Sequence, residues 1–207
     1  MHDTKKAPQT ETNRPVETKG PTTTVTSKNT STESMGISHH KDPALINLIK
    51  GASEWWNRFL NCDRPCWLVL VGSSETGKTH VLDWIWKEAK HRGLTHAFKA
   101  SFNPRRIWWP DFVNQLRAGN AYEEIADVRS WPLLAVDEIG ASRDTTGFIS
   151  DQLYFMLAQR ERKWTVLTSN LTMEQFTKMD ERITSRALRN DGVLIEVKTV
   201  PYGSRKP

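Results

Sequence analysis

Apolar residues follow a helical period in one stretch near the start of the folded part of the chain. They recur every three or four positions, which predicts an amphipathic helix: Leu45, Leu48, Ile49, Ala52, Trp55, Trp56, Phe59 and Leu60. Asp42 and Pro43 precede this stretch, and they suit the N-cap and the first turn of a helix. We expect the helix to pack on the domain that follows it. A docking helix for a partner is the alternative.

From Pro65 onward, short apolar runs alternate with helical patterns. We predict strands at residues 67–71, 97–101, 133–137, 165–168 and 193–197. We predict helices between and after them at residues 79–92, 110–117, 148–162, 173–178 and 181–188. Strands that are apolar throughout indicate a parallel sheet covered by helices on both faces, so the expected fold class is α/β.

The first part of the chain is polar. Residues 1–41 are mostly Thr, Ser, Lys, Glu, Pro and Asn, and no aromatic residue occurs before Trp55. Because such a segment buries too little apolar surface to offset its ordering entropy, we expect a disordered tail. The predicted organisation is a polar tail, an N-terminal helix, a core and a short C-terminal tail, at residues 1–41, 42–62, 63–200 and 201–207.

Charge and cysteine content limit the partners and the cellular compartment that we expect for the protein. The net charge of +5 allows a polyanionic partner without requiring one. No apolar run approaches the roughly 18 residues of a membrane span, and the first residues lack the apolar core of a signal peptide. Cys62 and Cys66 have no further zinc ligands at suitable spacing, so we interpret them as a reduced pair. We expect a soluble, cytoplasmic protein with no membrane partner.

The segment "GSSETGKT" matches the phosphate-loop pattern G-x-x-x-x-G-K-[ST], with a predicted strand before it and a predicted helix after it. The glycines allow backbone N–H groups to face a triphosphate, Lys78 reaches the β and γ phosphates, and the hydroxyl of Thr79 suits Mg²⁺. We therefore predict ATP and Mg²⁺ as ligands, with a flexible glycine turn as the alternative. The predicted nucleotide-binding residues are Gly72, Ser73, Ser74, Glu75, Thr76, Gly77, Lys78, Thr79 and His80.

Two adjacent acids end an apolar strand in "WPLLAVDEIG". The C-terminal edge of a parallel sheet is where such folds bind ligands. Asp137 suits the shell of Mg²⁺ together with Thr79, and Glu138 suits the orientation or deprotonation of an attacking water. A kinase does not need the second acid, so the pair favours hydrolysis. An exposed acidic pair at a strand end is the alternative.

Polar residues also follow the next predicted strand and line a later helix. Asn170 ends "WTVLTSN", where its amide suits a γ-phosphate, although Ser-Asn is also common in turns. Arg182 and Arg186 are four residues apart on one helical face, and Arg189 lies near the same stripe. Both a solvated basic helix and an arginine finger for a neighbouring subunit fit this pattern.

A candidate DNA site lies between the second and third predicted strands. In "KASFNPRRIWWPDFVNQLR", basic side chains alternate with aromatic rings, as in proteins that bind single-stranded DNA. Packing of the tryptophans onto the sheet is the alternative. The predicted DNA contacts are Lys99, Arg105, Arg106 and Trp108.

The motifs "GSSETGKTH", "LLAVDEIG", "LTSN" and "DERITSRALRNDG" occur in the order and spacing of the DnaC/DnaI helicase loaders and the IstB transposition ATPases, which are AAA+ proteins. The chain resembles them over about residues 44–200. The resemblance implies an AAA+ core with a five-stranded parallel sheet in the order 5-1-4-3-2, and ATP bound between subunits of a homo-oligomer. It implies that Asn170 is sensor 1 and Arg186 the arginine finger, so that Glu138, Asn170 and Arg186 form the catalytic set.

The chain also departs from these relatives. Loaders carry a folded or zinc-bearing N-terminal region, where we expect only a tail and one helix, and we expect no helical lid domain after Val197. The resemblance implies an ATPase that assembles on single-stranded DNA and helps to load a replicative helicase. An IstB-like transposition helper that acts on duplex DNA is the nearest alternative. A small phosphate-loop kinase or nucleotide-dependent scaffold without DNA is a third.

Overall fold

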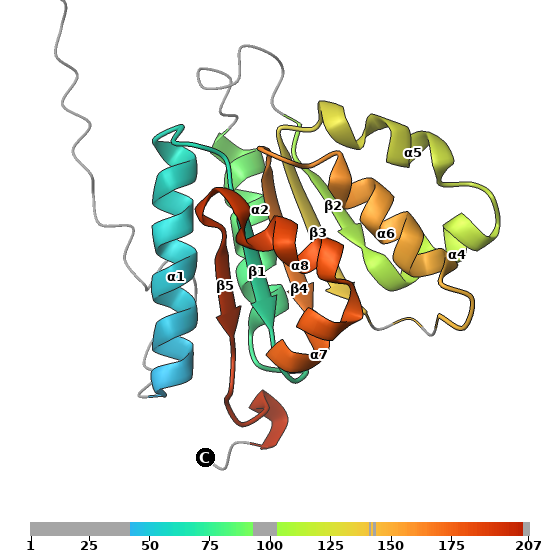
Figure 1. Ribbon diagram of the computed structural model, residues 1–207. Coiled ribbons are helices and arrows are strands. Elements are labelled where there is room, and N and C mark those ends of the chain that lie inside the picture. The colour runs from blue at the N-terminus through green and yellow to red at the C-terminus, as the bar shows by residue number, and fades with distance from the viewer. Residues whose placement is uncertain (1–41, 93–102, 141, 143, 205–207) are drawn as a thin grey trace, which may run out of the picture.

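The computed structural model describes residues 42–92, 103–140, 142 and 144–204 of the chain. Figure 1 shows a sheet with helices on both of its faces. The strands are all parallel. In spatial order they are β2 (Arg105–Trp108), β3 (Leu133–Ile139), β4 (Trp164–Ser169), β1 (Trp67–Val71) and β5 (Val193–Glu196). The predicted α/β class and the predicted order 5-1-4-3-2 are therefore confirmed.

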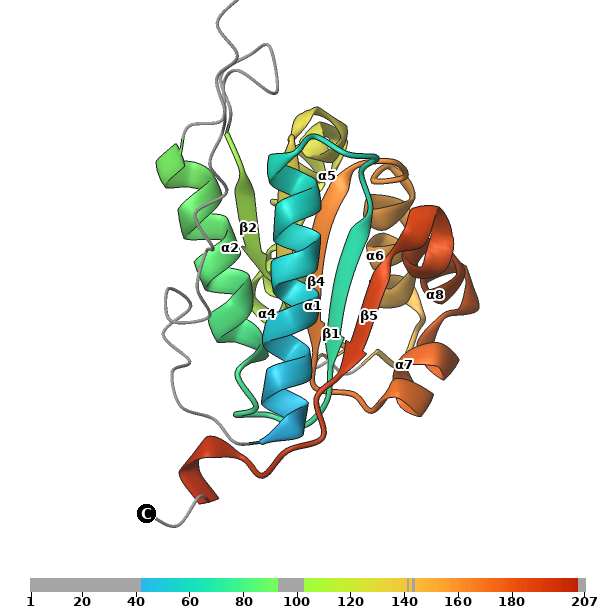
Figure 2. The same ribbon diagram turned by 90° about the vertical axis from the view of Figure 1, so that its left-hand side faces the viewer.

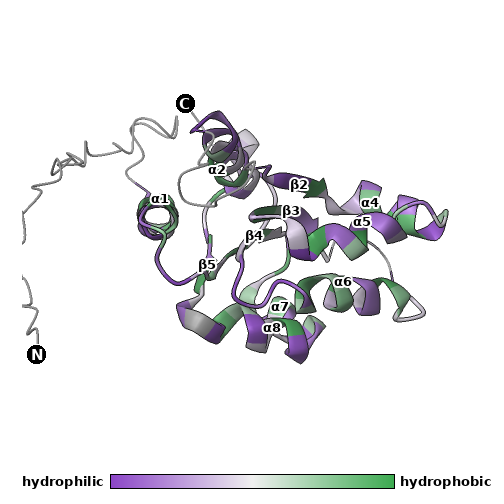
Figure 3. Cartoon of the chain, turned by 90° about the horizontal axis from the view of Figure 1, so that it is seen from above, coloured by the Kyte–Doolittle hydropathy of each residue, from purple (hydrophilic) through white to green (hydrophobic). Residues whose placement is uncertain are grey.

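The helices form two layers, one on each face of the sheet (Figure 3). One layer contains α1 (Pro43–Leu60) and α2 (Lys78–Arg92). The other contains α4 (Trp109–Arg117), α5 (Tyr122–Asp127), α6 (Phe148–Ala158), α7 (Met173–Met179) and α8 (Glu181–Leu188). Short 3₁₀ turns occur at Val128–Ser130, Arg189–Asp191 and Tyr202–Ser204. Within the described residues, no helix combines the length and apolar character that a membrane span requires.

Strand β1 shows why a central strand of this sheet can be apolar throughout. Trp67, Val69 and Val71 face one helical layer, whereas Leu68 and Leu70 face the other, because side chains alternate along a strand. All five are buried. A strand with a core on each side needs apolar residues at every position, and this is the pattern from which it was predicted.

Helix α1 packs on the core. The carboxylate of Asp42 caps it by accepting from the backbone N–H of Ala44 at 2.9 Å, and Pro43 occupies its first position, as predicted. Trp55 and Phe59 are fully buried and meet the ring of Trp164 edge to face. The apolar face of α1 is therefore occupied by its own domain, which favours the first of the two interpretations of this helix.

The second strand of the sheet differs from the expectation. The predicted strand at 97–101 lies outside the described residues, and the strand next to β3 is β2, within the segment that we predicted to contact DNA and for which we predicted no strand. Only Ile107 of β2 is buried. Because an edge strand of this kind buries only one side chain, its sequence contains no apolar run from which a strand could be predicted. Helix α5 was also not predicted, and α6 ends at Ala158, before the expected residue 162.

A buried arginine ties the early ends of two strands together. Arg160 is fully buried, and its guanidinium donates to the carbonyls of Val128 at 2.8 Å, Trp131 at 2.6 Å and Trp164 at 2.6 Å. Burial lowers the pKa of this guanidinium to about 9, so it stays protonated at neutral pH. The charge is tolerated because the planar fork of donors satisfies several backbone oxygens at once.

Replacement of Arg160 should therefore destabilise the fold. Arg160→Met would leave three buried carbonyls without their donor, and we expect the free energy of unfolding to fall by about 3–5 kcal/mol. Urea unfolding measures this, with the exposed Arg129→Met as the matched control, which should change the value by less than about 0.5 kcal/mol. A loss below about 1 kcal/mol for Arg160→Met would contradict the assigned role.

Candidate functional site

The phosphate loop joins the C-terminal end of β1 to the N-terminus of α2 (Figure 2). Gly72 has φ of +134°, its N–H donates to the carbonyl of Leu171 at 2.8 Å, and a Cβ at this position would collide with the carbonyl oxygen of Val197. Gly77 has φ of +95°. Only glycine adopts such backbone without strain, so both glycines of the motif are required by the shape of the loop.

Lys78 points back into this loop. Its side chain is buried, with 4% exposed, and its Nζ donates to the carbonyl of Ser73 at 2.5 Å and to Oγ1 of Thr76 at 3.1 Å. Among the described residues, no carboxylate lies within ion-pair distance of this ammonium group. Burial lowers the pKa of Lys78 to about 8. A buried cation that has only neutral acceptors fits an anionic ligand such as a phosphate.

The backbone after β5 contacts the other side of the loop. Tyr202 donates its N–H to the carbonyl of Glu75 at 2.9 Å, and the N–H of Gly203 donates to the carboxylate of Glu75 at 3.2 Å. Glu75 itself has φ of +59°. No local sequence pattern predicts this contact, because it depends on where the chain runs after β5 (Figure 2). The C-terminal segment thus helps to hold the loop in its curved shape.

Asp137 is the most enclosed acid of the site, with a side chain that is 3% exposed. Its Oδ1 accepts from the hydroxyls of Thr79 at 3.0 Å and Thr168 at 2.5 Å. Its Oδ2 accepts from Nη2 of Arg106 at 2.9 Å. The two predicted metal ligands, Thr79 and Asp137, therefore lie together. No cluster of three His, Cys, Asp or Glu side chains occurs in the described part of the chain, so a Mg²⁺ ion here would also need phosphate oxygens.

Glu138 lies at a bulge between β3 and β4, and its φ is +62°. Its N–H donates to Oγ1 of Thr168 at 2.9 Å, and its carboxylate accepts from Nε1 of Trp108 at 3.2 Å. Arg106 and Trp108 are two positions apart on β2, and they contact Asp137 and Glu138 respectively. Both acids therefore contact side chains on the same face of β2, although consecutive residues of a regular strand point to opposite faces.

Thr168 is a site residue that the sequence analysis missed. Its hydroxyl bridges the carboxylate of Asp137 and the N–H of Glu138, and its signal was a hydroxyl near the C-terminal end of a buried strand. The predicted residue Asn170 directly follows β4 and is exposed. Since β4 lies between β3 and β1, Asn170 lies at the edge that carries the phosphate loop and the acids.

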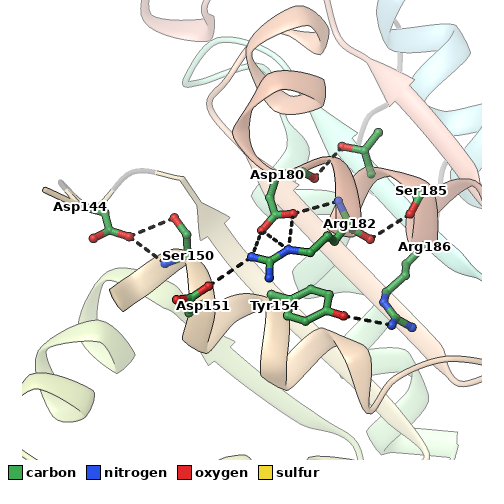
Figure 4. A network of polar contacts seen from close by, with 9 residues as sticks. Asp144, Ser150, Asp151, Tyr154, Asp180, Arg182, Ser185 and Arg186 are labelled. Atoms are coloured by element: carbon green, nitrogen blue, oxygen red, sulfur yellow. Dashed lines mark hydrogen bonds and ion pairs between the residues drawn. The ribbon is translucent and has the colours of Figure 1, made fainter. Parts of the chain in front are cut away.

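The arginines of α8 lie against α6, in the helical layer on the other face of the sheet from α2 (Figure 4). Arg182 pairs with Asp180 at 2.7 Å and lies over the ring of Tyr154, 4.0 Å from its centre. Arg186 pairs with Glu161 at 3.1 Å and donates to the hydroxyl of Tyr154 at 3.4 Å. Glu161 precedes the first residue of β4, whereas the phosphate loop follows the last residue of β1. Arg186 is therefore at the other end of the sheet from the nucleotide site of its own chain.

The predicted DNA contacts have different partners in the structure. Arg105 pairs with Glu124 at 3.4 Å and lies over the ring of Trp131, whereas Arg106 is held at the acidic edge by Asp137. Trp108 is half exposed beside Glu138. Lys99 lies outside the described residues. The neighbouring Trp109, which we considered for packing or DNA contact, is buried in the core.

The fold is similar to those of several DNA replication proteins. The DnaC helicase loader matches with a TM-score of 0.59 and 17% identity over 79% of this chain and 96% of its own. DnaI matches with a TM-score of 0.57 and 21% identity over 81% of this chain and 94% of its own. The replication initiator DnaA, bound to AMPPCP and single-stranded DNA, matches with a TM-score of 0.58 and 21% identity over 81% of this chain.

These similarities, all at 21% identity or less, show that the chain shares the fold of these proteins. The chain spans about half of the length of DnaA, 50%, and 49% of a DNA replication initiation factor that it also matches. No protein-family model matches the sequence, and no curated protein matches it.

The lowered pKa of Lys78 predicts proton uptake when a triphosphate binds. At pH 8 about half of these side chains are neutral in the free protein, and the bound anion favours the ammonium form. We expect uptake of about half a proton per ligand at pH 8 and weaker binding as the pH rises further. Calorimetry in two buffers with different ionisation enthalpies measures it. Lys78→Arg, which stays charged, should abolish the uptake; equal uptake in both proteins would assign the proton to another group.

Proposed function

We propose that this chain is an ATPase of the AAA+ type that acts in DNA replication, assembles on single-stranded DNA and helps to load a replicative helicase. One observation carries the ATPase part: the buried ammonium of Lys78 has only neutral acceptors and lies at the sheet edge that also carries Asp137 and Glu138. The replication part is supported by the shared fold of DnaC, DnaI and DnaA.

The proposed roles follow from the positions of the side chains. Backbone N–H groups of the phosphate loop and Lys78 would bind the β and γ phosphates, and Thr79 and Asp137 would hold Mg²⁺. Bound Mg²⁺ would neutralise charge that develops on the phosphates. Glu138, at the same edge as Asp137, would orient the attacking water and accept its proton. This second acid favours hydrolysis over transfer to a small-molecule acceptor.

Assembly into a homo-oligomer is part of the proposal, with Arg186 as an arginine finger in trans. Arg186 cannot serve its own nucleotide site, because its partner Glu161 precedes β4 at the far end of the sheet. Its guanidinium has one carboxylate and one phenol as partners, and a γ-phosphate of a neighbouring subunit would replace them with a stronger anion. Asn170, as sensor 1, would contact the γ-phosphate from the end of β4.

For DNA, we propose Arg105 and Trp108 as contacts, together with Lys99. Trp108 offers an exposed ring for base stacking, and Arg105 offers a guanidinium whose pair with Glu124 is long at 3.4 Å. Arg106 is the weaker of the predicted contacts, because two acids already surround its guanidinium. A DnaA structure of similar fold that holds single-stranded DNA supports this proposal.

Mixing two inactive variants tests the trans arginine. Lys78→Ala and Arg186→Ala should each lower ATP turnover about a hundredfold or more. A 1:1 mixture joins an intact pocket to an intact finger at about a quarter of the interfaces, so about a quarter of wild-type turnover should return. Lys78→Ala mixed with Glu138→Ala is the control, since every pocket is then defective. No rescue by proteins that do associate would contradict the assignment.

The DNA preference separates the remaining alternatives. We expect ATP turnover to rise with protein concentration and with single-stranded DNA, and Trp108→Ala to weaken single-strand binding about fivefold or more, measured without nucleotide. A preference for duplex DNA would favour an IstB-like transposition helper. Turnover that ignores DNA and requires a small-molecule acceptor would favour a kinase.

A further inference from the structure

Arg106 bridges two carboxylates at the proposed metal site. Its Nη2 lies 2.9 Å from Oδ2 of Asp137, and its Nε lies 2.7 Å from Oδ1 of Asp83. The three side chains come from β2, β3 and α2. Asp83 follows Thr79 by four residues on α2, which is about one helical turn. The guanidinium is therefore a cation placed at the group that would hold Mg²⁺.

Three donors already contact the carboxylate of Asp137. Oδ1 accepts from the hydroxyls of Thr79 and Thr168, and Oδ2 accepts from Arg106. A second cation at Oδ2 would lie close to the guanidinium, and two positive charges a few ångströms apart repel each other strongly in a partly buried site. Mg²⁺ and Arg106 therefore compete for the same carboxylate.

The bridge is not optimised as a permanent structural link. Although Nε of Arg106 is close to Asp83, its buried N–H makes no hydrogen bond, because it is not aligned with the carboxylate. A buried donor without an acceptor costs free energy. The side chain of Asp83 is 32% exposed and that of Arg106 is 28% exposed, so both have room to rearrange. Rotation of the guanidinium toward Asp83 alone would satisfy this donor and release Asp137.

We propose that Arg106 is a built-in competitor of Mg²⁺: it neutralises Asp137 in the nucleotide-free protein and moves to Asp83 when Mg²⁺ and the nucleotide bind. The inference rests on the proposed nucleotide site. Asp83 keeps the displaced guanidinium paired, so its release leaves no buried charge alone. The exchange reduces the apparent affinity for Mg²⁺, and it couples metal binding to the edge strand whose Trp108 contacts Glu138.

The test measures binding of a fluorescent non-hydrolysable ATP analogue to the full chain, with and without Mg²⁺. The ratio of the two affinities gives the coupling between metal and nucleotide, independently of turnover. Arg106→Gln removes the competitor, so we expect this ratio to rise about three- to tenfold. Asp83→Asn removes the alternative partner, holds Arg106 on Asp137 and should lower the ratio. Lys87→Gln, one turn beyond Asp83 on α2, is the matched control for loss of charge and should leave the ratio unchanged.

Four results would contradict the proposed role of Arg106. A ratio that is unchanged or lower in Arg106→Gln would overturn the inference, because Arg106 would then only orient Asp137 for the metal. An increase in Asp83→Asn would also overturn it, and this variant keeps the test valid if Arg106→Gln does not fold. Analogue binding that ignores Mg²⁺ in the wild type would remove the inference and leave nucleotide binding intact. No analogue binding under either condition would overturn both this inference and the proposed ATPase.

Discussion

The burial of one carboxylate organises the functional edge of the sheet. Asp137 is almost completely enclosed, and a buried charge is tolerated only when donors surround it. Its donors come from three elements: Thr79 at the start of α2, Thr168 on β4 and Arg106 on β2. These contacts hold the phosphate loop, the central strand and the edge strand in one arrangement. Thr79 at the start of α2 is thereby linked directly to the strand that carries both acids.

The two ends of the sheet carry different groups of polar side chains. The C-terminal ends of β1, β3 and β4 carry the phosphate loop, the acids and Asn170. The opposite end carries Arg160, which ties the starts of β3 and β4 through buried backbone carbonyls, and Arg186, which contacts Glu161 just before β4. A subunit that presents its pocket at one end and its cation at the other suits head-to-tail assembly, because each interface then joins one of each.

Strand β2 connects the proposed chemistry to the surface. It carries Arg106 and Trp108 on one face, and these side chains contact Asp137 and Glu138. As an edge strand it has fewer neighbours than β1 or β4. A ligand that bound Trp108 would therefore also act on the acid that is proposed to activate water. Under the proposed function, β2 is the part of the site where DNA binding and ATP hydrolysis would be most directly coupled.

The sequence alone determined the elements whose signals are local. Apolar runs marked β1, β3 and, over fewer residues, β4, because strands with a core on each side are rich in apolar residues. The phosphate-loop motif predicted Lys78 and Thr79 as nucleotide-binding residues, because glycines and a lysine at fixed spacing have few other uses. Tertiary structure alone decided the rest. The polar edge strand β2, the bridge of Arg106 between Asp83 and Asp137, and the contact of Tyr202 with Glu75 each join residues that are far apart in the chain. Such contacts depend on how the strands are ordered in the sheet, and no pattern of neighbouring residues records that order.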